Sequence, residues 1–160
     1  MCESKFVSCV KRNNRRIYLI ALSYTKSSAD AEDIMQNVFV KLWKYEKPFE
    51  NDEHIDKWLT VVTINESRDY IKNPFKRYKL PLEEAINLAA PNKNENIDLL
   101  KAVMELPKKE RTVIHLFYYE DMPVSDISQI LKIKESAVKT RLFRARKKLK
   151  SMLGDEWIYE

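Results

Sequence analysis

Cationic side chains at helical spacing are the strongest chemical signal in this sequence, and they lie in the segment Lys132–Lys150. The segment holds nine Lys or Arg residues against a single acid, Glu135. Its apolar residues follow steps of four, three, four and four, which places on one stripe of a helix Val138, Leu142, Ala145, Leu149 and Leu153. The cations therefore occupy the other faces, in water or against something negative. Ser136 or Glu135 is expected to cap the start of this helix.

A shorter helical pattern, Val124–Leu131, lies just upstream across the turn Lys132–Lys134. Two short helices of which the second is basic are typical of a helix-turn-helix, whose recognition helix enters the major groove of DNA. The backbone N–H groups at the start of such a helix also suit a phosphate. The simpler interpretation of the same residues is a solvated, lysine-rich C-terminal helix.

The other reactive side chains of the sequence do not form a catalytic or metal-binding constellation. Cys2 and Cys9 are the only cysteines and neither His54 nor His115 stands at metal-ligand spacing from them, so we predict two reduced thiols. The acidic run Asp-Ala-Glu-Asp at 30–33 has no second group of carboxylates or histidines to complete a metal site. The sequence also lacks a glycine-rich phosphate loop and a nucleophile elbow. We therefore predict no catalytic residue, no metal, no cofactor and no small-molecule substrate.

Length and composition bound the fold class. A chain of 160 residues with a net charge of +5 and 44% hydrophobic residues suits one compact domain or two small ones. Glycine occurs once, at Gly154, whereas strand-and-turn architectures need glycine for positive φ angles, so we predict an all-α protein. The apolar runs are too short to span a bilayer and no signal-peptide pattern follows the N-terminus. We expect a cytoplasmic protein without direct membrane insertion.

The N-terminal half begins with two helical patterns. The first, Phe6–Tyr24, is expected to break or bend at the polar run Asn13–Arg16. The second, Ala29–Tyr45, has N-cap chemistry in the run Ser27–Asp30. The predicted core stripe of this second helix consists of Ala31, Ile34, Met35, Val38 and Leu42.

A further apolar pair on that helix, Phe39 and Trp43, lies one turn apart and off the centre of the core stripe. One helix cannot easily bury both rows in so small a domain. The pair therefore either packs on a neighbouring helix or forms a partner-binding face. The polar residues that would surround such a face are Asp33, Gln36, Asn37 and Lys41.

A third helical pattern, Ile55–Lys72, follows a segment of turn-forming composition, Lys47–His54. Its predicted inner residues are Trp58, Leu59, Val62, Tyr70 and Ile71. A polar face able to meet nucleic acid is formed by Lys57, Asn65, Arg68 and Lys72. Taken without context, this face is more simply explained as solvated surface.

The proline after Asn73 ends the third helix, because the residue before a proline avoids the α region. We predict an N-terminal domain at 1–73, a flexible linker at 74–95, a helix-turn-helix domain at 96–153 and a tail at 154–160. The C-terminal domain is expected to contain four helices, at Ile97–Leu106, Pro107–Glu120, Val124–Leu131 and Glu135–Leu153. Pro107 suits a first helical position.

Four motifs in this order resemble one protein family. The segment Asp30–Trp43 closely resembles region two of bacterial extracytoplasmic-function sigma factors, and Trp58–Lys72 resembles the next helix of the same domain. Leu106–Ile114 resembles the opening of region four, and Val138–Leu149 resembles the region-four recognition helix. The resemblance covers nearly the whole chain except the linker and the last few residues.

The resemblance implies a subunit that core RNA polymerase uses to find promoter DNA. The helix Asp30–Trp43 would dock on the clamp helices of the largest polymerase subunit. The loop Lys47–His54 and the helix Ile55–Lys72 would hold the minus-ten element, with an unstacked base near Phe49 or Trp58. The linker would run through the RNA exit path of the polymerase, and a cognate anti-sigma factor would control the protein.

The resemblance further implies that the region-four helix reads the minus-thirty-five element. The implied reading residues are Glu135, Ser136, Lys139, Thr140, Arg141 and Arg144. The remaining cations, Lys147 among them, would hold phosphates. Family members often carry glycine at the position of Lys132, so the turn after Leu131 is expected to need a positive φ at a lysine or a different shape.

Two other classes of protein compete with a sigma factor. A one-component transcription regulator would use the N-terminal half for dimerisation or ligand binding and would bind its operator tightly as a two-fold symmetric dimer. A small helical metal-dependent hydrolase would use Asp30, Glu32 and Asp33, but it would need more ligands than the sequence offers.

Overall fold

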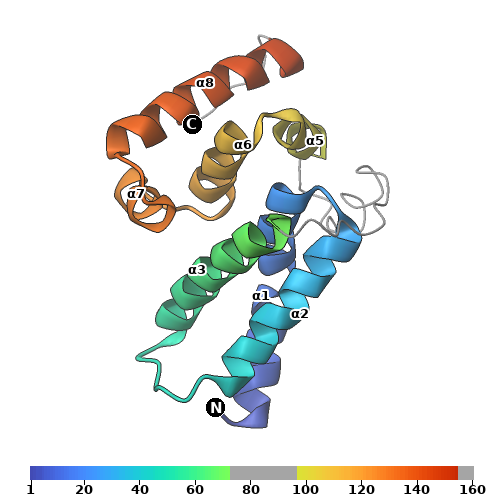
Figure 1. Ribbon diagram of the computed structural model, residues 1–160, viewed down its shortest axis with the longest axis vertical. Helices are drawn as coiled ribbons and strands as arrows, with labels where there is room; N and C mark the ends of the chain where they lie inside the picture. Colours follow the sequence, from blue (N-terminus) through green and yellow to red (C-terminus); the bar gives the residue numbers. More distant parts are fainter. Residues whose placement is uncertain (73–96, 155–160) are drawn as a thin grey trace. The chain divides into compact units, whose positions relative to one another are not determined.

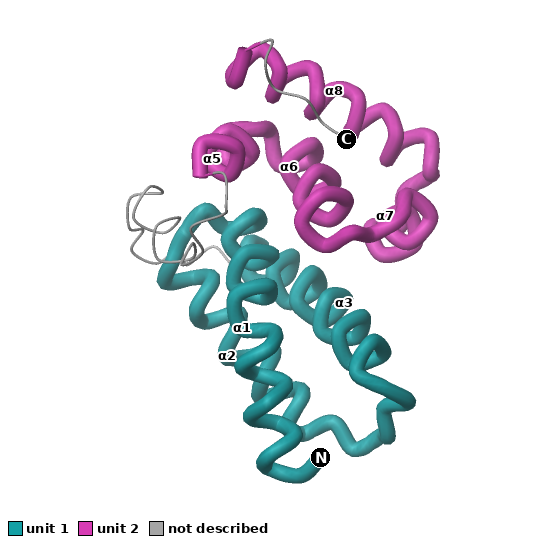
Figure 2. Tube along the Cα trace, turned by 180° about the vertical axis from the view of Figure 1, so that it is seen from behind, with its two compact units in different colours: residues 1–85 teal, residues 86–160 magenta. Residues whose placement is uncertain are grey.

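The computed structural model describes residues 1–72 and 97–154, and all regular structure in these ranges is helical (Figure 1). The chain divides into two compact units, residues 1–85 and 86–160 (Figure 2). The predicted all-α class with two small helical domains is therefore confirmed. The predicted linker at 74–95 lies outside the described residues, as does the predicted tail apart from Gly154. Within the described ranges, no helix is both long and apolar enough to cross a membrane.

The N-terminal unit is a bundle of three helices, α1 (Glu3–Thr25), α2 (Ser28–Lys44) and α3 (Asp52–Ile71), each packed on the other two. Ser27 caps α2 as predicted, because its side chain accepts from the backbone N–H of Asp30 at 3.3 Å. The largest fully buried side chains of this bundle are Ile17, Ile20, Leu22, Ile34, Leu42, Ile55, Leu59 and Ile64.

Helix α1 is continuous from Glu3 to Thr25, so of the predicted break or bend at Asn13–Arg16 the break does not occur. Asn13 is buried, and its side-chain amide donates to the carbonyl oxygen of Cys9 at 3.0 Å and to Oδ1 of Asp56 at 3.1 Å. Arg16 donates to the carbonyl oxygen of Asp56 at 2.7 Å. The polar run therefore remains helical because α3 satisfies its side chains, which sequence periodicity cannot reveal.

Helix α3 begins three residues before the predicted start, at Asp52 rather than at Ile55. The side chain of Asn51 accepts from the backbone N–H of His54 at 2.8 Å, which makes Asn51 the N-cap. Asp52 and Glu53 then stand in the first turn, where the helix dipole favours carboxylates. The loop between α2 and α3 is correspondingly shorter than predicted.

In the C-terminal unit, the long helix α8 (Glu135–Leu153) packs on α5 (Ile97–Glu105), α6 (Lys108–Ile114) and α7 (Val124–Leu131). The predicted helix Pro107–Glu120 divides into α6 and a π-helical turn, η1 (His115–Tyr119), and Pro107 stands one position before the helix, as its N-cap. The buried side chain of Arg111 donates to the carbonyl oxygen of Leu106 at 3.1 Å, which closes the turn between α5 and α6.

Of the two expected forms of the turn between α7 and α8, the chain adopts the positive φ at Lys132, with φ 55° and ψ 45°. A left-handed conformation at a non-glycine residue costs roughly 1 kcal/mol. It places the backbone N–H groups of Lys132 and Ile133 against the carbonyl oxygen of Ser128, and so ends α7. Lys134 occupies the N-cap position of α8, so the prediction that Ser136 or Glu135 caps this helix is wrong.

Candidate nucleic-acid interface

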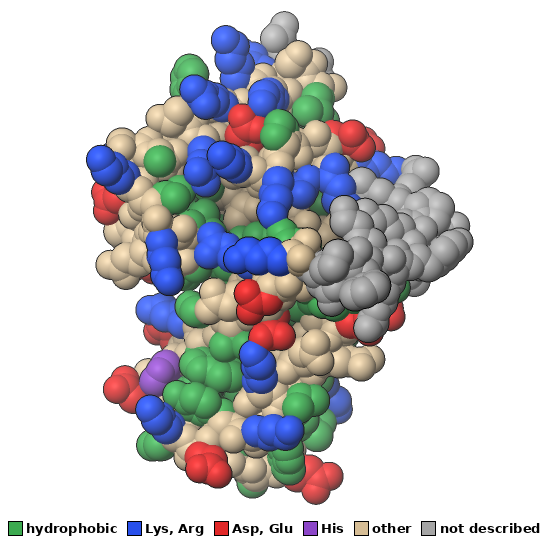
Figure 3. All heavy atoms as spheres, in the orientation of Figure 1, with side chains coloured by type: hydrophobic (Ala, Val, Ile, Leu, Met, Phe, Trp, Pro, Cys, Tyr) green, Lys and Arg blue, Asp and Glu red, His purple; other side chains and the backbone are tan. Residues whose placement is uncertain are grey.

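Helix α8 has one buried and one exposed side, as its sequence predicts. The predicted inner residues Val138, Leu142, Ala145 and Leu149 are at most 2% exposed, whereas the fifth, Leu153 in the last turn, is half-buried. On the outer side, Arg141 is half-buried and the other residues predicted to contact DNA are exposed, namely Glu135, Ser136, Lys139, Thr140, Arg144 and Lys147. Figure 3 shows Lys and Arg side chains gathered over the surface of the C-terminal unit. An exposed, cation-rich helix face of this kind fits the major groove of DNA.

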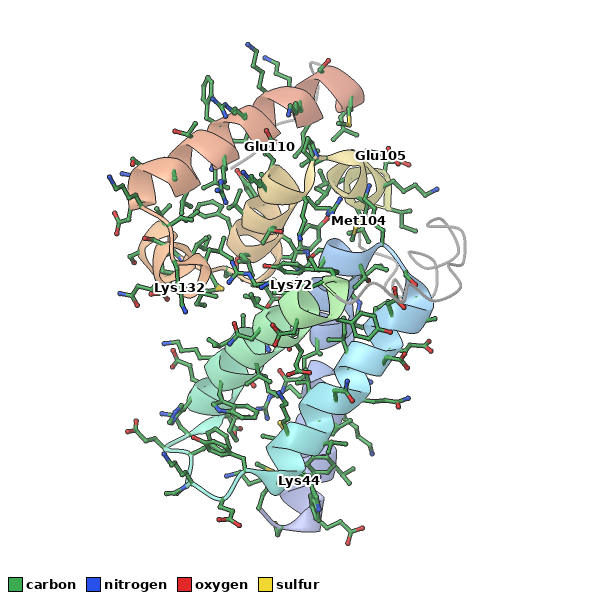
Figure 4. All side chains as sticks on the ribbon, viewed as in Figure 1. Lys44, Lys72, Met104, Glu105, Glu110 and Lys132 are labelled. Carbon is green, nitrogen blue, oxygen red and sulfur yellow. The ribbon has the colours of Figure 1, made fainter. Side chains whose placement is uncertain are left out.

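Two cations of α8, the half-buried Arg146 and the more exposed Lys148, bind side chains of other elements in the same unit. Nε of Arg146 donates to the hydroxyl of Tyr118 at 2.8 Å, and its guanidinium lies 5.4 Å from the ring centroid of Phe117. Nζ of Lys148 lies 2.9 Å from Oε1 of Glu110, a residue of α6 that is labelled in Figure 4. The π-helical turn supplies both aromatic partners of Arg146. These contacts hold α8 on α6 and η1. Lys148 lies against a negative charge, one of the two expected settings, whereas Arg146 lies against aromatic rings, which was not expected.

Phe143 is a surface residue that the sequence reasoning missed. It is 66% exposed and stands on the outer side of α8, between Thr140 and Lys147. Phe143 lies outside the apolar stripe of the helix, and a large aromatic residue at such a position is expected to be exposed. This position could have identified it from the sequence. In a major groove, an aromatic side chain can contact the methyl group of thymine.

The outer face of α3 carries the residues that were predicted to meet nucleic acid. Asn65, Lys57 and Lys72 are exposed, Arg68 is half-buried, and Val61 between them is 37% exposed. Nζ of Lys57 forms an ion pair with Glu53 at 3.1 Å, one turn away on the same helix. The face therefore offers amide, cationic and apolar contacts along one side of α3.

A cluster of aromatic rings lies where the loop after α2 meets α3. The ring of Phe49 stacks on Tyr45 with centroids 4.9 Å apart, and it meets the edges of His54 at 5.3 Å and Trp58 at 5.7 Å. Phe49, Tyr45 and Trp58 are half-buried. Partly exposed rings of this kind form a surface on which an unpaired base can stack.

The exposed face of α2 differs in one residue from the predicted partner-binding face. Gln36, Asn37 and Lys41 are exposed and Asp33 is half-buried. Trp43 is 50% exposed and rests its ring on Phe6 with centroids 5.0 Å apart, whereas Phe39 is only 8% exposed and belongs to the core. Val40, which is 50% exposed, takes the outward position that was predicted for Phe39. Phe39 therefore packs within the bundle, and Trp43 is the member of the pair that remains exposed.

Two residues at the border of this α2 face are tied to α3. The Tyr70 hydroxyl lies 3.1 Å from Oδ2 of Asp33 and 3.2 Å from Oδ1 of Asp30, and Lys41 forms an ion pair with Glu66. Burial raises the pKa of Tyr70, and the neighbouring Asp30 carboxylate raises it further, so the hydroxyl keeps its proton and is the donor. In the described parts of the chain, no group of three or more His, Cys, Asp or Glu residues is arranged to hold a metal ion.

Comparison with known proteins matches both units to one family. The family model for sigma-70 region 2 matches residues 9–74, and the model for sigma-70 region 4 matches residues 97–149. RNA polymerase sigma factor SigV of Bacillus subtilis is 29% identical over 157 residues, which cover 96% of this chain and 94% of that protein. ECF RNA polymerase sigma factor SigM of Mycobacterium tuberculosis is 24% identical over 151 residues, covering 93% of this chain and 77% of that protein.

Solved structures show the same fold. The sigma factor RpoE from Bartonella quintana, solved in complex with the anti-sigma factor NepR, aligns with a TM-score of 0.68 at 18% identity and covers 96% of this chain and 99% of its own. CnrH, solved in complex with the cytosolic domain of CnrY, aligns with a TM-score of 0.61 at 24% identity. The alignment covers 98% of this chain and 92% of CnrH.

A region-two unit followed by a region-four unit defines the promoter-specificity subunits of RNA polymerase. The chain belongs to the extracytoplasmic-function sigma factors of the sigma-70 family. It directs core polymerase to promoters, a regulatory role, and this result disfavours the one-component regulator as an alternative.

Proposed function

We propose that the exposed face of α8 reads the minus-thirty-five element of the promoter. The observation that carries this assignment is the two-sidedness of the helix. Val138 and Leu142 anchor one side in the core, while Lys139, Thr140 and Arg144 stand in solvent on the other. Arg146 and Lys148 are engaged within the unit, so the remaining outward cations are the ones available to bases and phosphates.

We assign the minus-ten element to α3 and to the aromatic cluster before it. Asn65 and Arg68 supply polar contacts along α3, and Phe49 with Tyr45 supplies the stacking surface for an unpaired base. Taking a base out of the stack costs a few kcal/mol, and stacking on an aromatic ring returns about 1–3 kcal/mol per base. The arrangement therefore supports promoter melting as well as recognition.

We assign polymerase docking to the exposed face of α2. Val40 and Trp43 provide an apolar centre, and the surrounding polar residues are Asp33, Gln36, Asn37 and Lys41. An apolar centre with a polar rim is the usual anatomy of a protein–protein interface. Phe39 is buried in the core of the unit, so we do not assign it a direct contact with the polymerase.

Replacing Gln36 with arginine is expected to weaken binding to core polymerase by about tenfold or more. An arginine in the polar rim adds bulk and an unpaired charge to the buried contact, at a cost of about 1.4 kcal/mol or more. Gln36 is exposed, and surface substitutions change the free energy of unfolding by less than about 0.5 kcal/mol, so the melting temperature should not change. The measurement is the affinity of the labelled chain for core polymerase, beside a thermal melt.

Asn14→Arg is the matched control, because it adds the same charge to the exposed surface of α1 in the same unit. Equal core affinities for the two variants would remove α2 from the docking interface. Asp33 is a poorer test position, since its bond to Tyr70 gives any substitution there a structural effect as well.

We also propose a protein anti-sigma factor as the regulatory partner, acting in the cytoplasm with the polymerase. The structurally similar sigma factor RpoE was solved with the anti-sigma factor NepR, and CnrH was solved with the cytosolic domain of CnrY. A partner that covers the exposed face of α2 or of α8 would prevent polymerase or promoter binding by direct competition.

A further inference from the structure

We propose that Tyr70 is a positioning residue for polymerase docking, which acts by fixing the carboxylate of Asp33 at the border of the α2 face. This proposal rests on the docking role assigned to α2 above. Tyr70 lies in the last turn of α3, and Asp33 lies near the start of α2. The hydroxyl therefore joins the C-terminal end of one helix to the N-terminal end of the other.

The geometry makes the Tyr70 hydroxyl a shared donor between two carboxylates. It lies 3.1 Å from Oδ2 of Asp33 and 3.2 Å from Oδ1 of Asp30. Asp30 is 6% exposed and stands in the first turn of α2, where the helix dipole favours its negative charge. Asp33 is half-buried beside the exposed Gln36 and Asn37. The hydrogen bond from Tyr70 thus orients the Asp33 carboxylate at the edge of the docking face. The same hydroxyl also contacts the buried Asp30, which restricts its position.

A second contact holds the same face from the same side of α3. Glu66, one turn before Tyr70, forms an ion pair with Lys41 of α2. The side chain of Lys41 is 55% exposed and that of Glu66 is 17% exposed, so the carboxylate is the inner partner and the cation the outer one. Two charged side chains of the α2 face are therefore oriented by α3 before any partner binds, which reduces the entropy lost on association.

Tyr18 provides a matched comparison for Tyr70 within the same unit. Its hydroxyl lies 3.0 Å from Oγ of Ser28, in the first turn of α2, so it too joins a tyrosine to the start of that helix. Ser28 is buried and lies outside the docking face. Loss of the Tyr18 hydroxyl should therefore affect the stability of the bundle alone, whereas loss of the Tyr70 hydroxyl should also affect Asp33.

The test compares Tyr70→Phe with Tyr18→Phe in the full-length protein. Both variants are expected to lower the melting temperature, because Tyr18 loses a buried hydrogen bond and Tyr70 loses partly buried ones. Only Tyr70→Phe should weaken binding to core polymerase, by about tenfold, which is the size expected for a lost bond to a charged group. In the background of Asp33→Asn, Tyr70→Phe should cause little further loss, because the two residues act through one contact.

Other outcomes distinguish the role of Tyr70 from the assignment of the docking face. Core affinity unchanged in Tyr70→Phe, or losses that simply add in the double variant, would overturn the positioning role of Tyr70. If Gln36→Arg still weakens core binding in the same assay, the docking face itself stands. If Gln36→Arg has no effect either, the assignment of α2 to polymerase is wrong, and the role of Tyr70 falls with it.

Discussion

Inserting about five base pairs between the two promoter elements should abolish initiation by polymerase carrying this sigma factor. Half a helical turn of DNA moves one element to the opposite side of the duplex. Each unit alone presents a modest basic face whose non-specific affinity is weak and salt-sensitive. Polymerase joins the two contacts into a bivalent one, and bivalent binding is lost when geometry forbids simultaneous engagement.

The measurement of this effect is a transcription assay with core polymerase, the full-length chain and a series of spacer lengths. An insertion of the same length upstream of the minus-thirty-five element is the control and should leave initiation unchanged. The free chain should bind short duplexes that carry only one of the two elements weakly, whichever element the duplex carries. Initiation that tolerates any spacer length would show that the two units do not act together on one promoter.

Replacing Arg144 with alanine should reduce promoter use by about tenfold or more. A side chain that contacts a base edge contributes about 1–3 kcal/mol of discrimination, and its loss relaxes the preference at one base position. Arg144 is exposed on the outer face of α8, so its removal should leave the melting temperature unchanged. The measurement is promoter activity over a set of single-base variants of the minus-thirty-five element, with its salt dependence.

Arg146→Ala is the natural control, since it removes the same side chain two positions along the same helix. Arg146 donates to Tyr118 and lies over two aromatic rings, so its loss should lower the melting temperature without changing base preference. If Arg144→Ala and Arg141→Ala both leave promoter activity and salt dependence unchanged, α8 faces the DNA with a different side than proposed.

The helices were predictable because their apolar spacing is regular and their ends have local signals. Ser27 caps α2 and the lysine after Leu131 ends α7, both through contacts within a few residues. The continuity of α1 through Asn13 was not predictable, because it depends on Asp56, which is distant in sequence. The π-helical turn at His115–Tyr119 was missed for a related reason, since a single extra residue per turn hardly alters the apolar pattern.

The sequence predicts which face of a helix is exposed more reliably than it predicts the contacts of a single side chain. The outer face of α8 follows directly from the buried stripe, and six of its seven predicted residues are exposed. Periodicity cannot show that Arg146 and Lys148 turn back to Tyr118 and Glu110, because those partners come from other helices. It also cannot show that Phe39 is buried, because Phe39 lies at the edge of the core stripe of α2. Val40 lies on the opposite side of the helix from that stripe, where periodicity does predict an exposed residue.

Initiation by core polymerase at a discrete DNA site is the most direct test of whether this chain directs the polymerase to promoters. Purified core polymerase, a library of DNA fragments and the full-length chain are combined, and the start sites are mapped with and without the chain. We expect start sites that appear only when the chain is present and that share two elements at a constant spacing. Start sites unchanged by the chain, together with tight binding of the free protein to a two-fold symmetric sequence, would contradict this expectation.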